Sequence, residues 1–494
     1  MTKPASSAVL SLRPMVSADA GLLFEWRNRP EIVAAGSSNR GVLWSEHTEW
    51  CARVLGGPDH LPLIIVIDGD PAGHIGFVPQ ADGEGTWAVS VYLAEEYTGQ
   101  GFGPRAIRWG CWEAFQRLPA SRIAAKVRAG NDRSVVAFER AAFTIASRDA
   151  AHTILHLRRP APVPHNRVSA EPGDAEAVAA VVSSGRWSSG DQVKRLEVAL
   201  AEAAGTAHAV GVASGSSALR LALAALGIGE GDHVGVPAYG CVALPNAALA
   251  CGAQPVPLEV ERGTWNAAPT FAPSGLRAII VVDTFGTRAP VKGWEPGVPV
   301  IEDCAHASVS GRASVAVTSF FTTKLVGAGE GGAVLTDHTE VAAFVRAWRD
   351  YDELPPGSGR ANHRLSDIHA ALALRRLEHL PSVLAARRER ALRYFELLEA
   401  APVRLPAPDD DRAWYRFAIE VDGEAAAWVD ALASYGIVAA RPVTDWRPPG
   451  VAATPNADLA YRSVLSLPLF PTLTPEDQHR VAHGVVAVAS TIGT

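Results

Sequence analysis

Short, wholly apolar runs separated by helical segments dominate the second half of the chain. Ala278 to Val282 and Val298 to Ile301 are two such runs, and His233 to Pro237 and Ala333 to Thr336 are two more. Strands that are apolar on both faces are typical of a parallel sheet covered by helices on each side. The pattern therefore predicts an α/β fold with a mainly parallel sheet, in which ligands bind at the carboxyl ends of the strands.

Two ionisable residues follow predicted strands in this half. Asp303 stands just after the run ending at Ile301, and Lys324 comes about twenty residues later, between the segment Ser319 to Thr323 and a glycine cluster ending at Gly332. A carboxylate at such a strand end can pair with a pyridinium nitrogen, and a lysine in a tight pocket can form a Schiff base. Taken singly, Asp303 could also be a helix N-cap and Lys324 a solvated surface lysine.

A third segment supports the same chemistry. The predicted strand Ala207 to Ala213 is followed by Gly215, Ser216 and Ser217, and then by a predicted helix from Ala218 to Leu226. Free N–H groups and hydroxyls at a helix start form an anion site, which suits a 5′-phosphate. Ordinary N-capping by the same serines is the alternative reading.

Residues from about 166 to 494 resemble the DegT/StrS-type sugar aminotransferases, pyridoxal phosphate (PLP) enzymes of fold type I. The pieces that carry the resemblance occur in order along the chain. They are Ser188-Ser189-Gly190, Leu196-Glu197, Ser214 to Leu219, Gly227 to Asp232, Pro237-Ala238-Tyr239, Glu302 to Ala307, Ser319 to Lys324, Gly329 to Gly332, Arg349-Asp350-Tyr351, Asn362-His363-Arg364 and Leu465 to Pro468.

The resemblance implies roles for individual residues. Lys324 would carry the Schiff base and move a proton, and Asp303 would hold the pyridine nitrogen. The phosphate would be bound by Gly215, Ser216, Ser217 and Ser319. His306 would contact the cofactor's phenolic oxygen or ring face, and Tyr239 would lie near the cofactor or substrate, with Cys241 or a simple packed aromatic as alternatives.

The family's active sites lie between subunits. Asn362, and with it Arg364, would reach the PLP phosphate of the neighbouring subunit, which implies a homodimer; a role in stabilising their own loop is the alternative.

The first 160 residues show a different pattern. Predicted strands run over Val9 to Arg13, Leu61 to Ile67, His74 to Val78 and Trp87 to Leu93, with a helix over Ala20 to Asn28 and an Asp68-Gly69-Asp70 hairpin. The loop Gly99, Gln100, Gly101, Phe102, Gly103 then leads into a helix near Arg105 to Gln116. Such a loop can cradle an anion. A dinucleotide fingerprint, the pyrophosphate arm of coenzyme A and a featureless loop are the competing readings.

Residues from about Leu12 to Leu157 resemble the GNAT acetyltransferases, in particular the subgroup that acetylates amino-sugar nucleotides. The glycine loop just named would bind the pyrophosphate of acetyl-CoA, with Asn131 and Ser134 along the coenzyme arm. Phe138 stands where many relatives carry a tyrosine that protonates the leaving thiolate, and it lacks that hydroxyl. For the base, His47 is the first candidate because its neutral pKa suits the task, and Glu49 and Glu46 are alternatives. Arg27 could pair with a substrate phosphate.

Composition argues against several other classes of protein. A formal net charge of −7 argues against nucleic-acid binding, and no apolar run is long enough to predict a membrane span. No signal peptide is evident, and five scattered cysteines without zinc spacing fit reduced thiols, so we expect a cytoplasmic protein without a metal.

The sequence thus predicts a GNAT mixed α/β domain (1–160), a Pro-rich linker (161–168) and a fold-type I aminotransferase domain (169–494) with a small α+β subdomain from about 385. We expect a bifunctional enzyme that transaminates a keto sugar nucleotide, with L-glutamate as donor, and acetylates the amine with acetyl-CoA. The alternatives are an aminotransferase for a cyclitol or other small ketone whose GNAT domain is a binding or regulatory module, and a PLP-dependent dehydratase, against which Lys324 argues.

Overall fold

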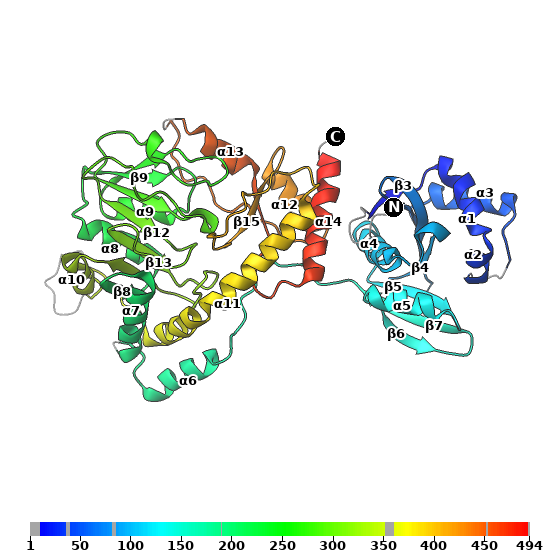
Figure 1. Cartoon of the computed structure of the whole chain (residues 1–494), viewed down its shortest axis with the longest axis horizontal. Helices are drawn as coiled ribbons and strands as arrows, with labels where there is room; N and C mark the ends of the chain where they lie inside the picture. The colour runs from blue at the N-terminus through cyan, green and yellow to red at the C-terminus, as the bar shows by residue number, and fades with distance from the viewer. Residues whose placement is uncertain are drawn as a thin grey trace. The chain divides into compact units, whose positions relative to one another are not determined.

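The computed structural model describes residues 10–35, 40–81, 85–188, 190–350, 360–450 and 453–492. The chain divides into two compact units, Met1–Ala161 and Pro162–Thr494, each of which is described by itself (Figure 1). Val9, Ser189 and Tyr351, which belong to the predicted strand and motifs above, lie outside the described residues.

The first unit is built on a seven-stranded sheet with the order β1-β2-β3-β4-β5-β7-β6. Its strands are β1 (Leu10–Pro14), β2 (Leu61–Ile67), β3 (Asp70–Pro79), β4 (Thr86–Leu93), β5 (Arg122–Arg128), β6 (Thr144–Arg148) and β7 (His152–Arg158). The β2–β3 hairpin turns at Asp68 and Gly69, both with positive φ, as the Asp-Gly pair predicts. Only one neighbouring pair among these strands, β4 and β5, is parallel.

Helices cover both faces of this sheet. They are α1 (Ala20–Arg27), α2 (Pro30–Ala35), α3 (Trp44–Gly56), α4 (Phe102–Arg117) and α5 (Asp132–Arg140). Ile75 on β3 packs so closely on α4 that a side chain at Gly110 would meet it at 2.5 Å. Ile64 on β2 faces the other way and packs with Leu23 of α1 and Val54 of α3. Alternate strand residues therefore serve two separate cores.

The second unit is built on another seven-stranded sheet, with the order β10-β9-β11-β12-β13-β14-β8. Its strands are β8 (His208–Val212), β9 (His233–Pro237), β10 (Gln254–Leu258), β11 (Ala278–Val282), β12 (Val300–Asp303), β13 (Val315–Ser319) and β14 (Gly332–Thr336). Only β14 runs antiparallel to its neighbours, and the other adjacent pairs are parallel. The predicted fold class, a mainly parallel sheet covered by helices, is confirmed.

Both faces of this sheet are buried. Val210 and Val212 of β8 pack with α8 (Gly215–Ala225), α9 (Ala243–Ala250) and α10 (Thr339–Trp348), whereas Ala209 packs with α7 (Asp191–Ala204). The preceding helix, α6, covers Asp174–Ser184. Short 3-10 turns lie at Ser17–Asp19, Glu95–Tyr97, Pro269–Phe271 and Thr284–Gly286.

A single helix, α11 (Asp367–Leu398), replaces the two predicted helices Leu365 to His379 and Leu384 to Ala400. It contains Pro381, which removes one backbone donor. Leu380 and Val383 are buried on either side of the proline, so packing keeps the helix continuous. The helix extends from the large sheet to the small subdomain (Figure 1).

The small subdomain contains a two-stranded antiparallel sheet and three helices beside the end of α11. They are β15 (Phe417–Glu420), β16 (Val464–Leu467), α12 (Ala425–Ser434), α13 (Pro455–Ser463) and α14 (Pro475–Ile492). Tyr394 of α11 packs here with Phe417 and donates its hydroxyl to the carbonyl of Pro468.

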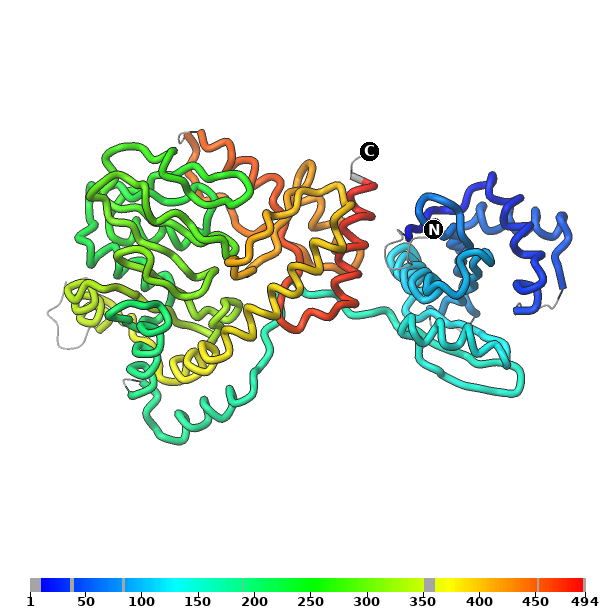
Figure 2. The backbone as a smooth tube through the Cα atoms, in the orientation of Figure 1, coloured from blue at the N-terminus to red at the C-terminus, as the bar shows by residue number. Residues whose placement is uncertain are grey.

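The Pro-rich segment predicted as a spacer is built into this subdomain from Pro162 onward. Val163 is buried in the subdomain core, donates its N–H to Gly436 and accepts from Val438. The guanidinium of Arg167 lies over the ring of Phe470. Figure 2 shows the segment passing α14 and α11 before it reaches α6. Val163 explains why this proline-rich stretch packs on the subdomain. A free spacer would leave the apolar surface of Val163 exposed to water, whereas packing buries it.

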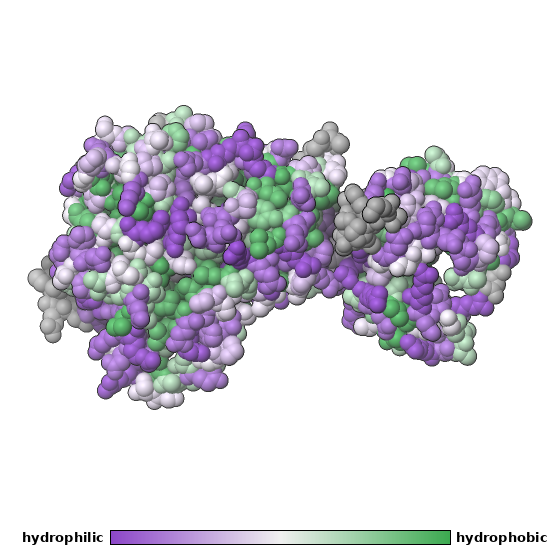
Figure 3. Space-filling view, viewed as in Figure 1, coloured by the Kyte–Doolittle hydropathy of each residue, from purple (hydrophilic) through white to green (hydrophobic). Residues whose placement is uncertain are grey.

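Within the described ranges, no helix is both long and apolar enough to cross a membrane. In the face shown in Figure 3, hydrophilic and hydrophobic residues are interspersed over each unit.

Two candidate active sites

The start of α8 forms a cradle at the carboxyl end of β8. Ser214 caps the helix by accepting a hydrogen bond from the N–H of Ser217 at 3.1 Å. The helix begins at Gly215, three residues earlier than predicted, so Gly215 and Ser216 lie in its first turn, where N–H groups lack helical partners. A Cβ on Gly215 would lie 2.8 Å from the Cβ of Ser319, so glycine lets the end of β13 reach this turn. The predicted phosphate-binding residues are therefore brought together.

His363 also reaches the cradle, which the sequence analysis did not anticipate. Its Nδ1 lies 3.0 Å from the hydroxyl of Ser217. The flanking residues behave differently: Asn362 is exposed and accepts from the N–H of Arg364, whose guanidinium pairs with Asp350. His363 stands inside the Asn362-His363-Arg364 motif that carries the family resemblance, and this position was the sequence signal that could have identified it.

Asp303 and Lys324 meet at the carboxyl ends of β12 and β13. Asp303 is the last residue of β12, and its Oδ1 accepts from the N–H of Ala305 at 2.9 Å. Burial raises the pKa of the Asp303 carboxyl, while that hydrogen bond and the charge of Lys324 act in the opposite direction. Lys324 lies in the turn after β13, with Nζ 4.9 Å from the ring centroid of Tyr415.

Three aromatic rings form a stack beside these residues. His306 lies 4.3 Å from Tyr415 and 6.4 Å from Phe285, with nearly parallel planes. Phe285 has a positive φ in the 3-10 turn after β11. Burial, together with the charge of Lys324, lowers the pKa of His306, so its ring is neutral. Its buried Nδ1 has no hydrogen-bond partner among the residues that the structure describes, which leaves this atom for a ligand. Phe285 and Tyr415 were not predicted as site residues.

Tyr239 is fully buried; it packs edge-on against Tyr461 and Phe285 and in a tilted arrangement against Trp265. Its environment is therefore the packed aromatic cluster that the sequence left open as an alternative. The buried hydroxyl has no hydrogen-bond partner in the described part of the chain, and burial raises its pKa, so Tyr239 is a neutral phenol. Cys241, two residues later, is exposed.

The glycine loop of the first unit forms a second cradle. Gly99 and Gly101 have φ of 78° and 87°, and Gly101 is the N-cap of α4, without a side-chain cap. A Cβ at Gly101 or Gly103 would meet nothing within 4 Å, so the loop faces open space. The neighbouring parallel strands pair only at Thr86–Ala88 of β4 and then diverge. These features fit an anion at the start of α4.

Not all residues predicted for this loop contribute side chains. Gln100 donates its amide to the carbonyl of Glu96, and Phe102 is buried in the core, so each can offer only its backbone N–H. Asn131 caps α5 by accepting from the N–H of Ser134. Phe138 is buried against Phe143. Phe138, which stands in place of the tyrosine, is thus part of the hydrophobic core.

The structure does not favour His47 as the acetyl-transfer base. The side chain is only 5% exposed, and Nε2 lies 2.8 Å from the carbonyl of Ala20, so this nitrogen must donate and cannot accept a proton. Glu46 pairs with Arg40 and caps the N–H of Leu43. Glu49 on α3 is exposed.

A stacked pair that the sequence did not indicate is formed by the buried His74 and the partly buried Tyr92, which packs with α1 and α3. His74 on β3 stacks on Tyr92, its cross-strand neighbour on β4, at 5.5 Å, and the Nε2 of His74 has no hydrogen-bond partner among the described residues. Burial lowers the pKa of His74 to about 4, so the ring is neutral. Arg27, predicted to pair with a substrate phosphate, is close enough to Tyr92 for its charge to affect that phenol.

Comparison with known proteins agrees with these two sites. Residues 169–486 match the family model described as the DegT/DnrJ/EryC1/StrS aminotransferase family, and residues 10–144 match that of the acetyltransferase (GNAT) domain. The first match spans more than half of the chain. The chain therefore belongs to the DegT/DnrJ/EryC1/StrS aminotransferase family and carries an N-terminal GNAT domain.

One curated relative is the dTDP-3-amino-3,4,6-trideoxy-alpha-D-glucose transaminase of Streptomyces venezuelae, 33% identical over 341 residues that cover 63% of this chain and 90% of that protein. Among solved structures, S. venezuelae DesV in complex with a ketimine intermediate is 30% identical with a TM-score of 0.60, and the alignment covers 67% of this chain and 99% of that chain. Bacillus subtilis NtdA with bound PMP has a TM-score of 0.59 over 65% of this chain and 83% of that chain; at 23% identity it shows the fold alone.

These matches give the chain two enzyme activities, a PLP-dependent aminotransferase and an acetyl-CoA-dependent acetyltransferase. The residues present fit PLP: the glycine at position 215 allows a phosphate cradle to close against Ser319, and the unpartnered Nδ1 of His306 lies beside Lys324. The open, positive-φ glycine loop before α4 fits the pyrophosphate of acetyl-CoA.

Proposed function

We propose that this enzyme transaminates a keto sugar nucleotide, with L-glutamate as the amino donor, and then acetylates the new amine with acetyl-CoA. One observation carries the proposal: a domain whose relative is a dTDP-sugar transaminase and an acetyltransferase domain occur in one chain. An aminotransferase makes a primary amine, and an N-acetyltransferase consumes one. The product would be an acetamido sugar nucleotide.

The chain's own residues would divide the work in the aminotransferase domain. The first turn of α8 and Ser319 would bind the phosphate of the cofactor, and Asp303 would hold the proton on its ring nitrogen. The cofactor supplies an electron sink when bound. Nζ of Lys324 would accept the proton from the α-carbon of the amino donor, and His306 would orient the cofactor from its unpartnered Nδ1.

In the GNAT domain, the N–H groups of Gly101 to Gly103 would bind the pyrophosphate of acetyl-CoA, with Asn131 and Ser134 near the coenzyme arm. Of the predicted bases, Glu49 is proposed in place of His47, because Glu49 is exposed and, within the described residues, its side chain takes part in no hydrogen bond or ion pair. Tethering of the two domains raises the concentration of the amine at the second site whatever their order in the chain.

The decisive experiment is a screen of keto sugar nucleotides with the full-length enzyme, PLP, glutamate and acetyl-CoA, read by mass. We expect an amine without acetyl-CoA and an acetamide with it. A second candidate function, favoured by Phe138, is an aminotransferase for a cyclitol or other small ketone with an inactive GNAT domain. It would show as amination of a cyclitol ketone in the same screen, without thiol release when an amino sugar nucleotide and acetyl-CoA are supplied.

Replacing Gly101 by tryptophan should separate the two activities. The side chain would occupy the open space at the start of α4, and its Cβ would strain a φ of 87°. Acetylation should fall about two- to thirtyfold, because an anion at a helix N-terminus is stabilised by about 0.3–1 kcal/mol, and by up to ~2 kcal/mol where it is partly buried. Transamination should continue, so free amine accumulates; amine and acetamide are measured separately over time.

The matched control is Gly69→Trp, which strains a φ of 95° in an equally open turn of the same domain but lies outside the loop. It should acetylate normally. If the Gly101 variant lost transamination while it stayed folded and PLP-loaded, the two domains would not act independently.

We also propose a homodimer in which Asn362 completes the partner's site, because Asn362 is exposed and its one side-chain hydrogen bond within the described residues is accepted from the N–H of Arg364, in its own loop. Lys324→Ala and Asn362→Ala subunits should each be inactive alone. A mixed dimer would contain one intact site, so random mixing should restore about a quarter of the wild-type transamination rate. Absence of recovery in proven mixed dimers would place Asn362 in its own loop only.

A further inference from the structure

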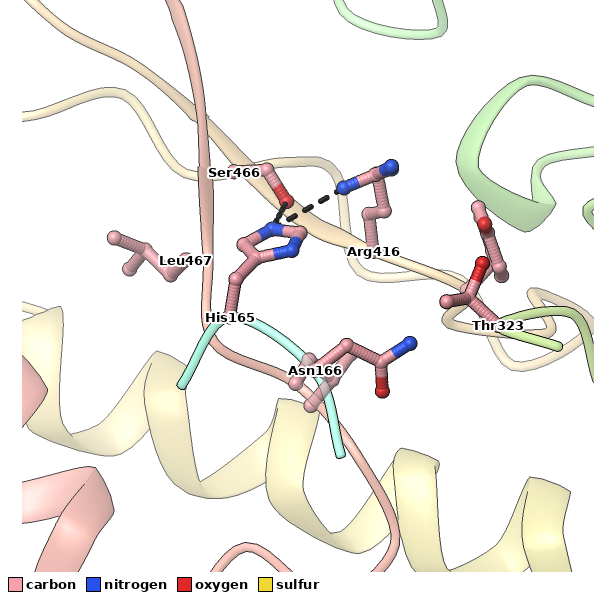
Figure 4. Close-up of a pocket in the computed structure, with 8 residues that line it drawn as sticks. His165, Asn166, Thr323, Arg416, Ser466 and Leu467 are labelled. Atoms are coloured by element: carbon pink, nitrogen blue, oxygen red, sulfur yellow. Dashed lines mark hydrogen bonds between the residues drawn. The ribbon is translucent and has the colours of Figure 1, made fainter. Parts of the chain in front are cut away.

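A small cavity in the second unit is lined in part by Thr323, the residue just before Lys324 (Figure 4). Three parts of the chain line it: the segment before α6, the turn after β13 that contains Lys324, and the β15–β16 sheet with the residues directly next to these strands. The lining residues are His165, Asn166, Thr323, Tyr415, Arg416, Ser466, Leu467 and Leu469. The centre of a water-sized sphere can move through about 60 Å³. One water needs about 10–15 Å³ on this measure, so a few waters or one end of a small molecule fit.

The cavity is electropositive. Arg416 lines it, and among the described residues no carboxylate forms an ion pair with its guanidinium; its contacts are His165 and the ring of Tyr415. A second arginine, Arg387, is buried and donates hydrogen bonds to the carbonyls of Trp414, Tyr415 and Leu469. Burial raises the pKa of the Tyr415 phenol, but the charges of Lys324 and Arg416, with help from Thr323 and Arg387, outweigh it and lower the pKa. The field therefore favours an anion.

His165 holds Arg416 in place. Its Nε2 lies 3.2 Å from a guanidinium nitrogen and 2.9 Å from the hydroxyl of Ser466 (Figure 4). Because a guanidinium can only donate, this Nε2 must accept, so the ring proton is on Nδ1. Burial, together with the charges of Arg416 and Arg387, lowers the pKa of His165 to about 4, so it stays neutral. His165 thus fixes Arg416 without neutralising its charge.

We propose that this cavity is the carboxylate subsite for the amino donor, with Arg416 as the binding residue and His165 as its positioning residue. The proposal rests on the transamination activity proposed above. Nζ of Lys324 and Cζ of Arg416 lie 4.9 Å and 5.3 Å from the centroid of the same Tyr415 ring. The two cationic groups are therefore no further apart than the sum of these distances, so an amino acid whose carboxylate is bound by Arg416 would hold its amine in the neighbourhood of Lys324. A planar guanidinium suits a carboxylate, which it can bind through two parallel hydrogen bonds.

Other anions fit the cavity less well. The cofactor phosphate has its own cradle at the start of α8. The diphosphate of a sugar nucleotide, with its base and sugars, exceeds the space for a few waters. The carboxylate could be the α-carboxylate shared by all amino acids or the side-chain carboxylate of glutamate, and the test below distinguishes them.

Part of this subsite lies outside the region that matches the aminotransferase family. The match begins at residue 169, whereas His165 and Asn166 precede it. The segment of the second unit that precedes α6 therefore contributes to the proposed donor subsite.

The test uses the full-length, PLP-loaded enzyme and the donor half-reaction, which needs no sugar. Glutamate is added at a series of concentrations, and the rate at which the cofactor's visible absorbance is lost is measured. The dependence of this rate on glutamate concentration gives the apparent Kd for glutamate. Arg416→Met should raise this Kd on the order of ten- to a hundredfold, because charge-assisted hydrogen bonds are lost. Arg416→Lys should lose less. The matched control is Arg404→Met, an exposed arginine of the same subdomain, which should leave the Kd unchanged.

A second readout avoids catalysis. Glutarate, which has two carboxylates and no amine, should bind the wild type in calorimetry and bind Arg416→Met at least about tenfold more weakly. Glutamine distinguishes the sources: an equal loss for glutamine and glutamate assigns the α-carboxylate, and a loss for glutamate alone assigns the side chain. If Arg416→Met does not fold, His165→Ala takes its place, with an expected severalfold rise in the Kd for glutamate.

Unchanged affinity for glutamate and glutarate in a folded variant, with either substitution, would overturn the subsite. Failure of the sugar-nucleotide screen would be a separate result. In that case a normal donor half-reaction that depends on Arg416 would still support the subsite while the proposed acceptor substrate was rejected.

Discussion

Replacing Lys324 by alanine is expected to lower transamination by at least about ten-thousandfold, since the change removes both the covalent attachment point and the proton-transfer group. Lys324 lies in the turn after β13, with Nζ 4.9 Å from the centroid of the Tyr415 ring, and its charge acts on the Asp303 carboxyl. Acetylation of a supplied amine should stay within about twofold of the wild-type rate, because the GNAT domain contains its own coenzyme site.

Borohydride treatment checks the chemical basis of this prediction. It should leave a PLP-modified peptide containing Lys324 in the wild type and no modified peptide in the variant. Lys194→Ala, which removes an exposed lysine paired with Asp191, is the control and should keep both activities. An unmodified Lys324 peptide in the reduced wild type would contradict the assignment.

Asp303→Asn should retain PLP and slow transamination on the order of a thousandfold, comparable with the loss of other preorganised electrostatic groups. The asparagine keeps the oxygen that accepts from the N–H of Ala305, so the end of β12 should hold its conformation. What is lost is the negative charge that stabilises a proton on the cofactor's ring nitrogen. Single-turnover rates with glutamate, together with the PLP content of the purified protein, measure the effect.

Asp337→Asn is the matched control for this change. Asp337 also follows a strand of the same sheet and accepts a backbone N–H, from Ala207, but it lies outside the site, so its variant should react at the wild-type rate. Near-normal turnover in Asp303→Asn would exclude the proposed role of the carboxylate.

Local patterns allowed much of the fold to be predicted. The strands Leu61–Ile67, His233–Pro237 and Ala278–Val282 have the predicted bounds, because a run of apolar residues ended by turn formers is a property of the segment itself. The continuity of α11 through Pro381 was not predictable in this way. It depends on Leu380 and Val383 being buried by other parts of the chain, and burial outweighs the local penalty of proline.

The site residues also differ in whether a local pattern or a contact between distant segments determines their environment. Lys324, Asp303 and Gly215 could be identified because each stands in a recognisable local motif, and the structure brings them together as the order of the strands requires. The environment of His47 was not predictable, since its contact with the carbonyl of Ala20 joins residues on two different helices.

The sequence by itself determined the two domain classes, the lysine and its carboxylate, and the two glycine-rich cradles, because these are set by residue types at fixed short spacings. Only the tertiary structure decided that His165, Arg416 and Ser466 share one small cavity. These residues come from segments far apart in the chain. Whether an arginine meets a carboxylate, a histidine or open space depends on the packing of distant strands and helices, which no local pattern contains.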